Sequence, residues 1–141
     1  MRRRFGTWTL VVVMVAFGFT VRVEAQPLEC RGAQKPQLVA ELLFGRKIGA
    51  QGYVSEGAWR RFVAREITPR FPDGLTILEG RGQWRDPDTK RIVREPSNVV
   101  LIAMPGHAED HDRLNEVAEA YKKQFRQESV GIIVRQACVS F

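Results

Sequence analysis

The 141-residue chain holds 22 Lys+Arg and 16 Asp+Glu, a formal net charge of +6, and a chain of this length fits one domain. Part of that charge is local, because the first 25 residues hold Arg2, Arg3, Arg4 and Arg22 against Glu24. The rest of the chain carries 18 basic and 15 acidic residues, or +3. So small an excess, with no arginine-rich stripe, does not predict a nucleic-acid partner.

The N-terminus has the parts of a cleavable signal peptide. Residues 2–4 are basic, Leu10–Val21 is an apolar run, and Val23-Glu24-Ala25 offers small residues where a signal peptidase cuts. We expect cleavage after Ala25, no membrane span after cleavage, and a periplasmic or extracellular protein. An uncleaved anchor is the alternative, although the run of about twelve residues is shorter than the roughly 20 needed to span a membrane.

Two cysteines, Cys30 and Cys138, lie near opposite ends of the expected mature chain. Paired cysteines usually oxidise in an exported protein, so we predict one disulfide between them. A redox pair or a metal site is the alternative, and neither a CxxC motif nor a neighbouring histidine supports it.

The first half of the expected mature chain contains a strand, a helix and a second strand. Residues 26–37 look irregular, and Leu38–Phe44 is the first strand. Ser55 is a helix N-cap, apolar residues then recur at helical spacing, and Pro69 ends the helix. The turn at residues 71–74 leads into a strand over Leu75–Arg85.

The second half begins with a turn at residues 86–89. Residues 90–95 return as a hairpin arm, and Pro96 is expected to break the ladder before a central strand, Asn98–Met104. A helix over about Ala108–Arg126 has one apolar stripe, and Ser129–Val139 is the last strand.

This order predicts an α+β, ferredoxin-like βαββαβ fold. Right-handed crossovers give a four-stranded antiparallel sheet in strand order 4-1-3-2 with two helices on one face. We divide the chain into a signal peptide (1–25), an irregular N-terminal segment (26–37) and a single domain (38–141).

The sheet face that the helices leave open is the expected functional surface. Side chains alternate along strands, and the wholly apolar sets are expected to meet the helices. The open face is then predicted to carry polar side chains among apolar ones: Glu41, Glu79, Arg81, Gln83 and Arg135 among Ile102, Met104 and Ile133.

Such a face has three interpretations. It is a solvated surface of ion pairs, an interface between two copies of the chain, or a small-molecule pocket beneath the hairpin. In the third case Glu41 is the candidate acid or base, since it lies on a central strand among apolar neighbours. Arg81 would line the same pocket.

Other motifs are weaker. Trp84 and Arg85 are expected at the hairpin tip, where they would stack on each other or on a ligand. His107 and His111 have helical spacing for a metal, but a polar helix start explains them equally well, so no metal or cofactor is predicted. The polar residues Gln127-Glu128-Ser129 are expected to cap the end of the second helix and lead into the last strand. The alternative is that Glu128 reaches Arg70 or Arg85 in a buried network beside the hairpin.

Several segments resemble a family of small exported bacterial proteins known as domain of unknown function 3574. They are Thr68-Pro69-Arg70-Phe71-Pro72-Asp73-Gly74-Leu75-Thr76, Gly82-Gln83-Trp84-Arg85, Tyr121, Phe125, Gln127-Glu128-Ser129-Val130, Cys138 and Phe141. The resemblance covers nearly the whole mature chain and implies a compact exported domain, but no activity.

The sequence therefore predicts a binding or self-associating module of the cell envelope. Its partner would be a small molecule, an envelope protein or a second copy. The alternative is a cofactor-free enzyme of the dimeric α+β barrel type that uses Glu41 and Arg81.

Overall fold

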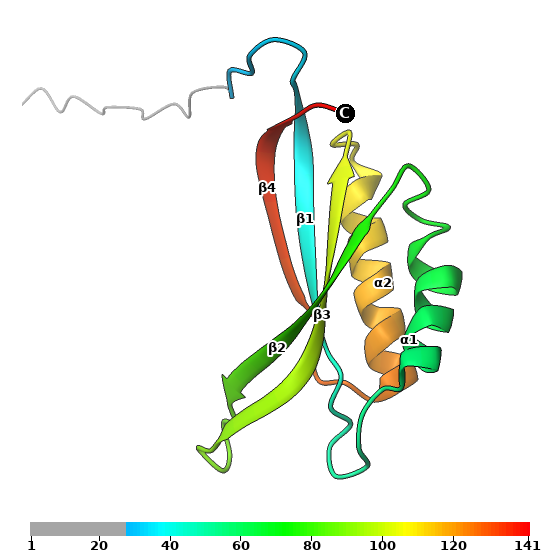
Figure 1. Ribbon diagram of the computed structural model, residues 1–141, viewed down its shortest axis with the longest axis vertical. Helices are drawn as coiled ribbons and strands as arrows, with labels where there is room; N and C mark the ends of the chain where they lie inside the picture. The colour runs from blue at the N-terminus through cyan, green and yellow to red at the C-terminus, as the bar shows by residue number, and fades with distance from the viewer. Residues whose placement is uncertain (1–27) are drawn as a thin grey trace, which may run out of the picture.

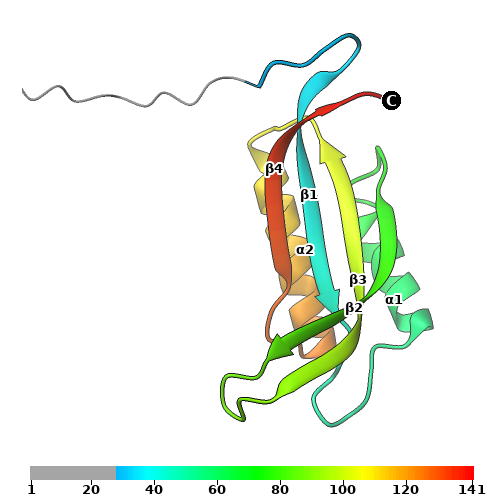
Figure 2. The ribbon, with the colours of Figure 1, turned by 60° about the vertical axis from the view of Figure 1, so that its left-hand side comes forward.

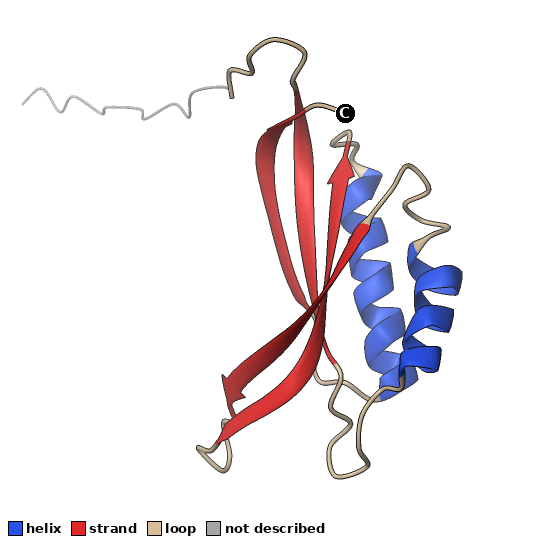
Figure 3. Cartoon of the chain, viewed as in Figure 1, coloured by secondary structure: helices blue, strands red, loops and turns tan. Residues whose placement is uncertain are grey.

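The computed structural model describes residues 28–141, so the predicted signal peptide lies outside the described residues. The elements, in chain order, are β1 (Lys35–Gly45), α1 (Glu56–Phe62), η1 (Val63–Ile67), β2 (Thr76–Arg85), β3 (Ile92–Met104), α2 (Glu109–Phe125) and β4 (Gly131–Val139). The strands form an antiparallel sheet in the order β2-β3-β1-β4. Both helices lie on one face of it (Figures 1 and 3), which confirms the predicted ferredoxin-like fold.

The helices begin and end where the sequence indicates. The Ser55 side chain caps α1 by accepting a hydrogen bond from the Ala58 N–H at 3.2 Å. The helix continues as a wider π-helical turn, η1, in which the Thr68 N–H donates to the Val63 carbonyl at 2.9 Å. Arg126, with φ of 52°, ends α2 in the left-handed conformation.

An aromatic cluster fills the space between the sheet and the helices. Phe44 of β1 contacts Tyr121 of α2 with ring centroids 4.8 Å apart, and Phe62 of α1 lies 5.1 Å from the same tyrosine ring. The Tyr121 hydroxyl donates to the Gly45 carbonyl at 2.9 Å, which satisfies a buried polar group at the end of β1.

β3 differs from the prediction because it runs unbroken through Pro96. Pro96 pairs with Arg81 of β2, while its carbonyl accepts a hydrogen bond from the Arg46 N–H at 3.0 Å. The nitrogen and the carbonyl of a strand residue point to the same side, so the Pro96 nitrogen faces the side of β1. The β1–β3 pairing ends at Gly45 and Ser97, one residue away from the proline. The β2–β3 ladder therefore loses nothing at the proline.

Two residues predicted for the open face lie in the core instead. Ile102 pairs with Ala40, and Met104 with Leu38, so both share the helix-facing side of β1. Both are buried. β3 is apolar on both faces, so alternation alone could not assign its residues to one side. Glu41 and Ile133, which oppose each other, do lie on the open face.

The far half of the β2–β3 hairpin has no neighbour in β1. It extends beyond the Gly45–Ser97 pair and bends away from the helices, toward the open face of the sheet (Figures 1 and 2). The open face is therefore concave at this end.

A disulfide joins Cys30 to Cys138, as predicted, with Cα atoms 5.4 Å apart. β1 begins at Lys35, three residues before the expected start, because its first residues pair with the end of β4. The bond therefore holds the N-terminal segment beside the last strand. No helix within residues 28–141 combines the length and the apolar character needed to cross a bilayer.

Candidate functional site

The concave end of the open face contains a groove of about 910 Å³. It lies between the bent hairpin, the segment after β1 and the junction between α2 and β4. The groove is lined by Leu43, Gly45, Lys47, Gly49, Ala50, Gly80, Arg81, Gly82, Gln83, Trp84, Asp86, Val93, Glu95, Ser97, Val99, Arg126, Gln127, Glu128, Ser129 and Gly131.

Glycines form much of the floor of the groove. Gly80 and Gly82 oppose Ser97 and Glu95 across the hairpin, so all four residues face the groove side of the sheet. A Cβ atom at Gly45 would lie 2.8 Å from Glu95 Oε2. The glycines on β2 also leave its backbone uncovered, which gives the strand room to bend.

Glu95 fixes one wall of the groove. Its Oε1 accepts a hydrogen bond from Trp84 Nε1 at 3.0 Å, and its Oε2 accepts one from the Lys47 N–H at 2.8 Å. These bonds tie the bent hairpin to the segment that follows β1. The indole of Trp84 is held in one orientation yet stays 41% exposed to the groove and solvent.

Two further side chains hold the segment after β1. Arg46 donates from Nε and Nη2 to the Val54 carbonyl, at 2.9 Å and 2.6 Å. Gln127 donates from Nε2 to the Lys47 carbonyl at 2.8 Å. The segment is therefore braced by the hairpin on one side and by the α2–β4 junction on the other.

Charged groups of both signs line the groove. Asp86 accepts backbone hydrogen bonds from Thr89 and Asp88, and these, with nearby Lys47, lower the pKa of its carboxyl. Within residues 28–141, no carboxylate lies within ion-pair distance of Lys47 or Arg126. Donors at the rim are thus free to meet a ligand.

The predicted site residues are divided between the two faces of the sheet. Glu41 and Arg135 form an ion pair on the open face, outside the groove lining. By register, Glu79, Arg81 and Gln83 oppose Asn98, Pro96 and Arg94, so their side chains leave the sheet on the other face. Arg81 and Gln83 nevertheless belong to the groove lining, whereas Glu79 does not. The prediction that these five residues share one face is therefore wrong.

The reason is that β2 is an edge strand with nearly every residue exposed. Where neither face is buried, the apolar pattern does not indicate which side meets the core. The apolar side chains of Leu78 and Trp84 oppose Val99 and Val93, so they lie on the open face and not against the helices.

Two further expectations at the hairpin fail. Trp84 and Arg85 point to opposite faces, so they do not stack, and the indole bonds to Glu95 instead. Glu128 does not reach Arg70, which binds Glu66 and Glu116. The expected cap at the end of α2 is present, because Gln127 donates from Nε2 to the Phe125 carbonyl at 3.3 Å.

Sequence reasoning missed Glu95, Lys47 and Gly45. Glu95 was assigned to the hairpin arm without a role. The sequence did contain a pattern that places Glu95. Side chains alternate along a strand, so Val93, Glu95 and Ser97 share one face, and Val93 opposes Trp84 across the hairpin. Glu95 is therefore expected on the same face as Trp84. Lys47 and Gly45 have no such pattern, since their positions follow from where β1 ends.

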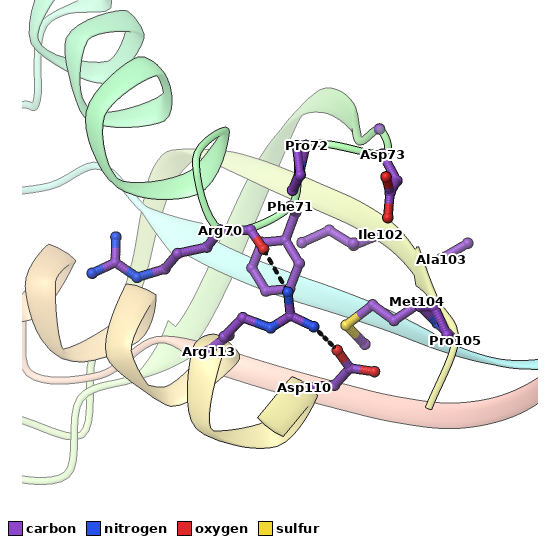
Figure 4. Close-up of a pocket in the computed structure, with 11 residues that line it drawn as sticks. Arg70, Phe71, Pro72, Asp73, Ile102, Ala103, Met104, Pro105, Asp110 and Arg113 are labelled. Atoms are coloured by element: carbon purple, nitrogen blue, oxygen red, sulfur yellow. Dashed lines mark hydrogen bonds and ion pairs between the residues drawn. The ribbon is translucent and has the colours of Figure 1, made fainter. Parts of the chain in front are cut away.

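A second cavity, of about 20 Å³, lies beneath the loop that joins η1 to β2 (Figure 4). The buried Asp110 carboxylate accepts from the N–H groups of Gly106 and His107 at 2.9 Å and 2.8 Å, and it pairs with Arg113. Arg113 also donates to the Arg70 carbonyl at 3.1 Å and lies over the Phe71 ring. This cavity has room for only about one water molecule, so its side chains dock the loop onto α2.

His107 and His111 are exposed, and the His107 N–H is bonded to Asp110. In the part of the chain that the structure describes, no group of three or more His, Cys, Asp or Glu residues is arranged to hold a metal.

The chain belongs to the family described as "Protein of unknown function (DUF3574)", whose model matches residues 39–141. This confirms the family resemblance of the sequence. No curated protein matches the chain.

Among solved structures, the chain is similar to a phage SAM lyase in complex with S-methyl-5'-thioadenosine, at 15% identity and a TM-score of 0.59 over 83% of this chain and 97% of that one. It is also similar to a phage SAM lyase in the apo state, at 17% identity and a TM-score of 0.54 over 82% and 92%. CutA from Synechococcus elongatus PCC7942 follows at 10% identity and a TM-score of 0.49 over 74% and 80%. At these identities the likeness to the lyases shows the fold.

Proposed function

We propose that the chain is an exported binding module that holds a small molecule in the groove. The observation that carries this proposal is the groove itself, about 910 Å³ beside a fixed, half-exposed indole. Ligand sites in proteins are usually concavities of roughly 300–1,000 Å³ with an apolar lining and a few polar groups.

The lining favours a ligand with a flat or apolar body and a polar end. Trp84 offers a ring face for stacking, and Leu43, Val93 and Val99 add apolar surface next to it. Lys47 lies at the rim, where its ammonium group can meet an acceptor on the ligand.

The same geometry supports binding more than catalysis. Both oxygens of Glu95, the carboxylate against the indole, already accept hydrogen bonds from the protein. Glu41 and Arg81 lie on opposite faces of the sheet, so an enzyme that uses both on one substrate has no support here.

The disulfide fits a location outside the cytoplasm, because such bonds persist in oxidising compartments. We therefore place the module in the periplasm or outside the cell. Purification from that compartment, followed by native mass spectrometry, is expected to show protein with an added mass.

A first defined probe is S-methyl-5'-thioadenosine, since one solved structure of similar fold carries it. The protein purified from that compartment is expected to lack Trp8, which belongs to the signal peptide. Of the other two tryptophans, Trp59 is buried and Trp84 is exposed, so iodide quenches chiefly Trp84. We expect a bound ligand to shield Trp84 from iodide, and Trp84→Ala to lose the added mass. Tyr53→Ala, an exposed aromatic outside the groove, is the matched control.

The proposal fails if the wild-type protein carries no added mass and the probe leaves iodide quenching unchanged. It also fails if an added mass is retained equally in Trp84→Ala and in Tyr53→Ala.

A further inference from the structure

Beyond the groove, the open face exposes large apolar side chains. Leu43 is 37% exposed, Leu78 is 54% exposed and Ile133 is 45% exposed. These residues come from β1, β2 and β4, and the pairing register places all three on the face opposite the helices. Val39, Val99, Leu101 and Ala103 lie on the same side.

Large apolar side chains gathered and exposed on one face are uncommon on a monomer. The other face of the same sheet is covered by α1 and α2 (Figure 1), but no element among residues 28–141 covers the open one. On this face Glu41 of β1 and Arg135 of the edge strand β4 form an ion pair.

That ion pair makes the surface complementary to itself. The Glu41 and Arg135 side chains keep 27% and 52% of their area exposed, so each can accept a second partner from outside. A two-fold axis that lies in an interface and passes between the two side chains brings Glu41 of one copy against Arg135 of the other. Opposite charges then meet in both halves of the contact.

The surface is also large enough. Eight residues of β1 pair with β3, and with four strands about 4.8 Å apart the face spans about 27 Å by about 19 Å. Two such faces in contact remove up to about 1,000 Å² from water, which meets the minimum expected of a biological interface.

We propose that the open face docks a second copy of this chain, face to face, about a two-fold axis beside Glu41 and Arg135. Leu43 and Val99 belong both to this face and to the groove lining. The second copy would therefore close the groove on its open side. The proposal does not depend on what the groove binds.

Sedimentation velocity over a range of concentrations tests the proposal, with protein obtained by expressing the full chain. The wild type is expected to be a dimer at micromolar concentrations. Ile133→Lys sets a lysine against its own symmetry mate in an apolar contact, which should raise the dimer dissociation constant about 100-fold or more.

Ile92→Lys is the matched control. Ile92 is 44% exposed, almost the same as Ile133, but it opposes Arg85 on the other face of the hairpin. This variant should dimerise as the wild type does. Circular dichroism of both variants shows whether each is folded.

A mixing experiment tests the orientation. Glu41→Arg alone and Arg135→Glu alone each place like charges at the centre of the contact, so each variant is expected to be monomeric. An equimolar mixture restores opposite charges across the contact and should give a heterodimer, detectable by native mass spectrometry.

A wild type that stays monomeric, or an assembly of another size, would overturn the proposal. An assembly that Ile133→Lys weakens no more than Ile92→Lys does would also overturn it. If the two charge variants fail to form a heterodimer when mixed, the proposed axis is wrong.

Discussion

Replacing Glu95 with alanine removes the carboxylate that ties the bent hairpin to the end of β1. The change deletes two hydrogen bonds, from the Lys47 N–H at 2.8 Å and from Trp84 Nε1 at 3.0 Å. Hydrogen bonds to a buried charged group contribute about 1.5–3 kcal/mol each. Because Glu95 is half-buried and water can reach the freed donors, about 1 kcal/mol for each bond is more realistic.

Glu95→Ala should therefore lower the free energy of unfolding by about 2 kcal/mol. For a domain of this size, that corresponds to a fall in Tm of about 8 °C. Glu95→Gln keeps one acceptor oxygen but turns an N–H group toward the second donor, so it should cost about 1 kcal/mol. Urea unfolding measures both values.

The effect should also be visible at Trp84. Without its acceptor the indole is free to turn toward solvent, so iodide quenching should increase in Glu95→Ala while the buried Trp59 stays protected. A double-mutant cycle with Trp84→Phe should give a coupling of about 1 kcal/mol.

Glu128→Ala is the control, since Glu128 lines the same groove but makes no hydrogen bond to a described residue. It should change stability by less than about 0.5 kcal/mol. If Glu95→Ala is no more destabilising than this control, the bonds of Glu95 do not brace the groove and the argument is refuted.

Four other changes test separate parts of the structure. Replacing Cys30 and Cys138 with alanine opens a loop of 108 residues, which should cost up to about 4–5 kcal/mol in thermal or urea unfolding; a loss below about 1 kcal/mol would contradict this estimate. Gly45→Ala places a methyl group against Glu95 Oε2 and should increase iodide quenching of the groove indole, whereas unchanged quenching would show that the carboxylate adapts. Asp110→Ala removes the partner of two backbone N–H groups and of Arg113. It should lower the free energy of unfolding by about 3 kcal/mol, and Asp110→Asn by roughly half as much. Equal losses in the two variants would contradict the role of the charge. The pKa of the Asp86 carboxyl is lowered, chiefly because the Thr89 N–H donates a hydrogen bond to it. The carboxylate should therefore stabilise the fold above its ordinary pKa of 3.8, and this stabilisation should be lost as the pH falls through its lower pKa in the folded protein. An NMR titration midpoint at or above 3.8 would refute this.

The sequence was sufficient for the parts of the fold that depend on local chemistry. Ser55 and Pro69 bound the first helical segment, because capping and the proline ring act within a few residues. The oxidised pair Cys30–Cys138 was also predictable, since only two cysteines are present.

The candidate site was harder, because it depends on pairing between strands. Trp84 was expected at the hairpin tip, but its side of the sheet was not predictable from an exposed edge strand. Arg81 and Glu41 could be placed on one surface only by assuming that side, and the register places them on opposite faces.

The groove depends on a longer-range fact, the length of β3 relative to β1. Because β1 ends at Gly45 while β3 begins at Ile92, part of the hairpin has no third strand to keep it flat. A free two-stranded ribbon twists more strongly than a wide sheet. No short motif indicates such a difference in strand length.

The bond between Cys30 and Cys138 closes a covalent ring that contains nearly all of the folded chain. A protease that cuts one peptide bond inside this ring, for example in the exposed turn at residues 87–90, opens the ring but releases no fragment. The cut protein keeps its mass apart from one added water, and it separates into two pieces only after reduction. A protein built this way tolerates a single cleavage in an environment where proteases are present and reductants are not.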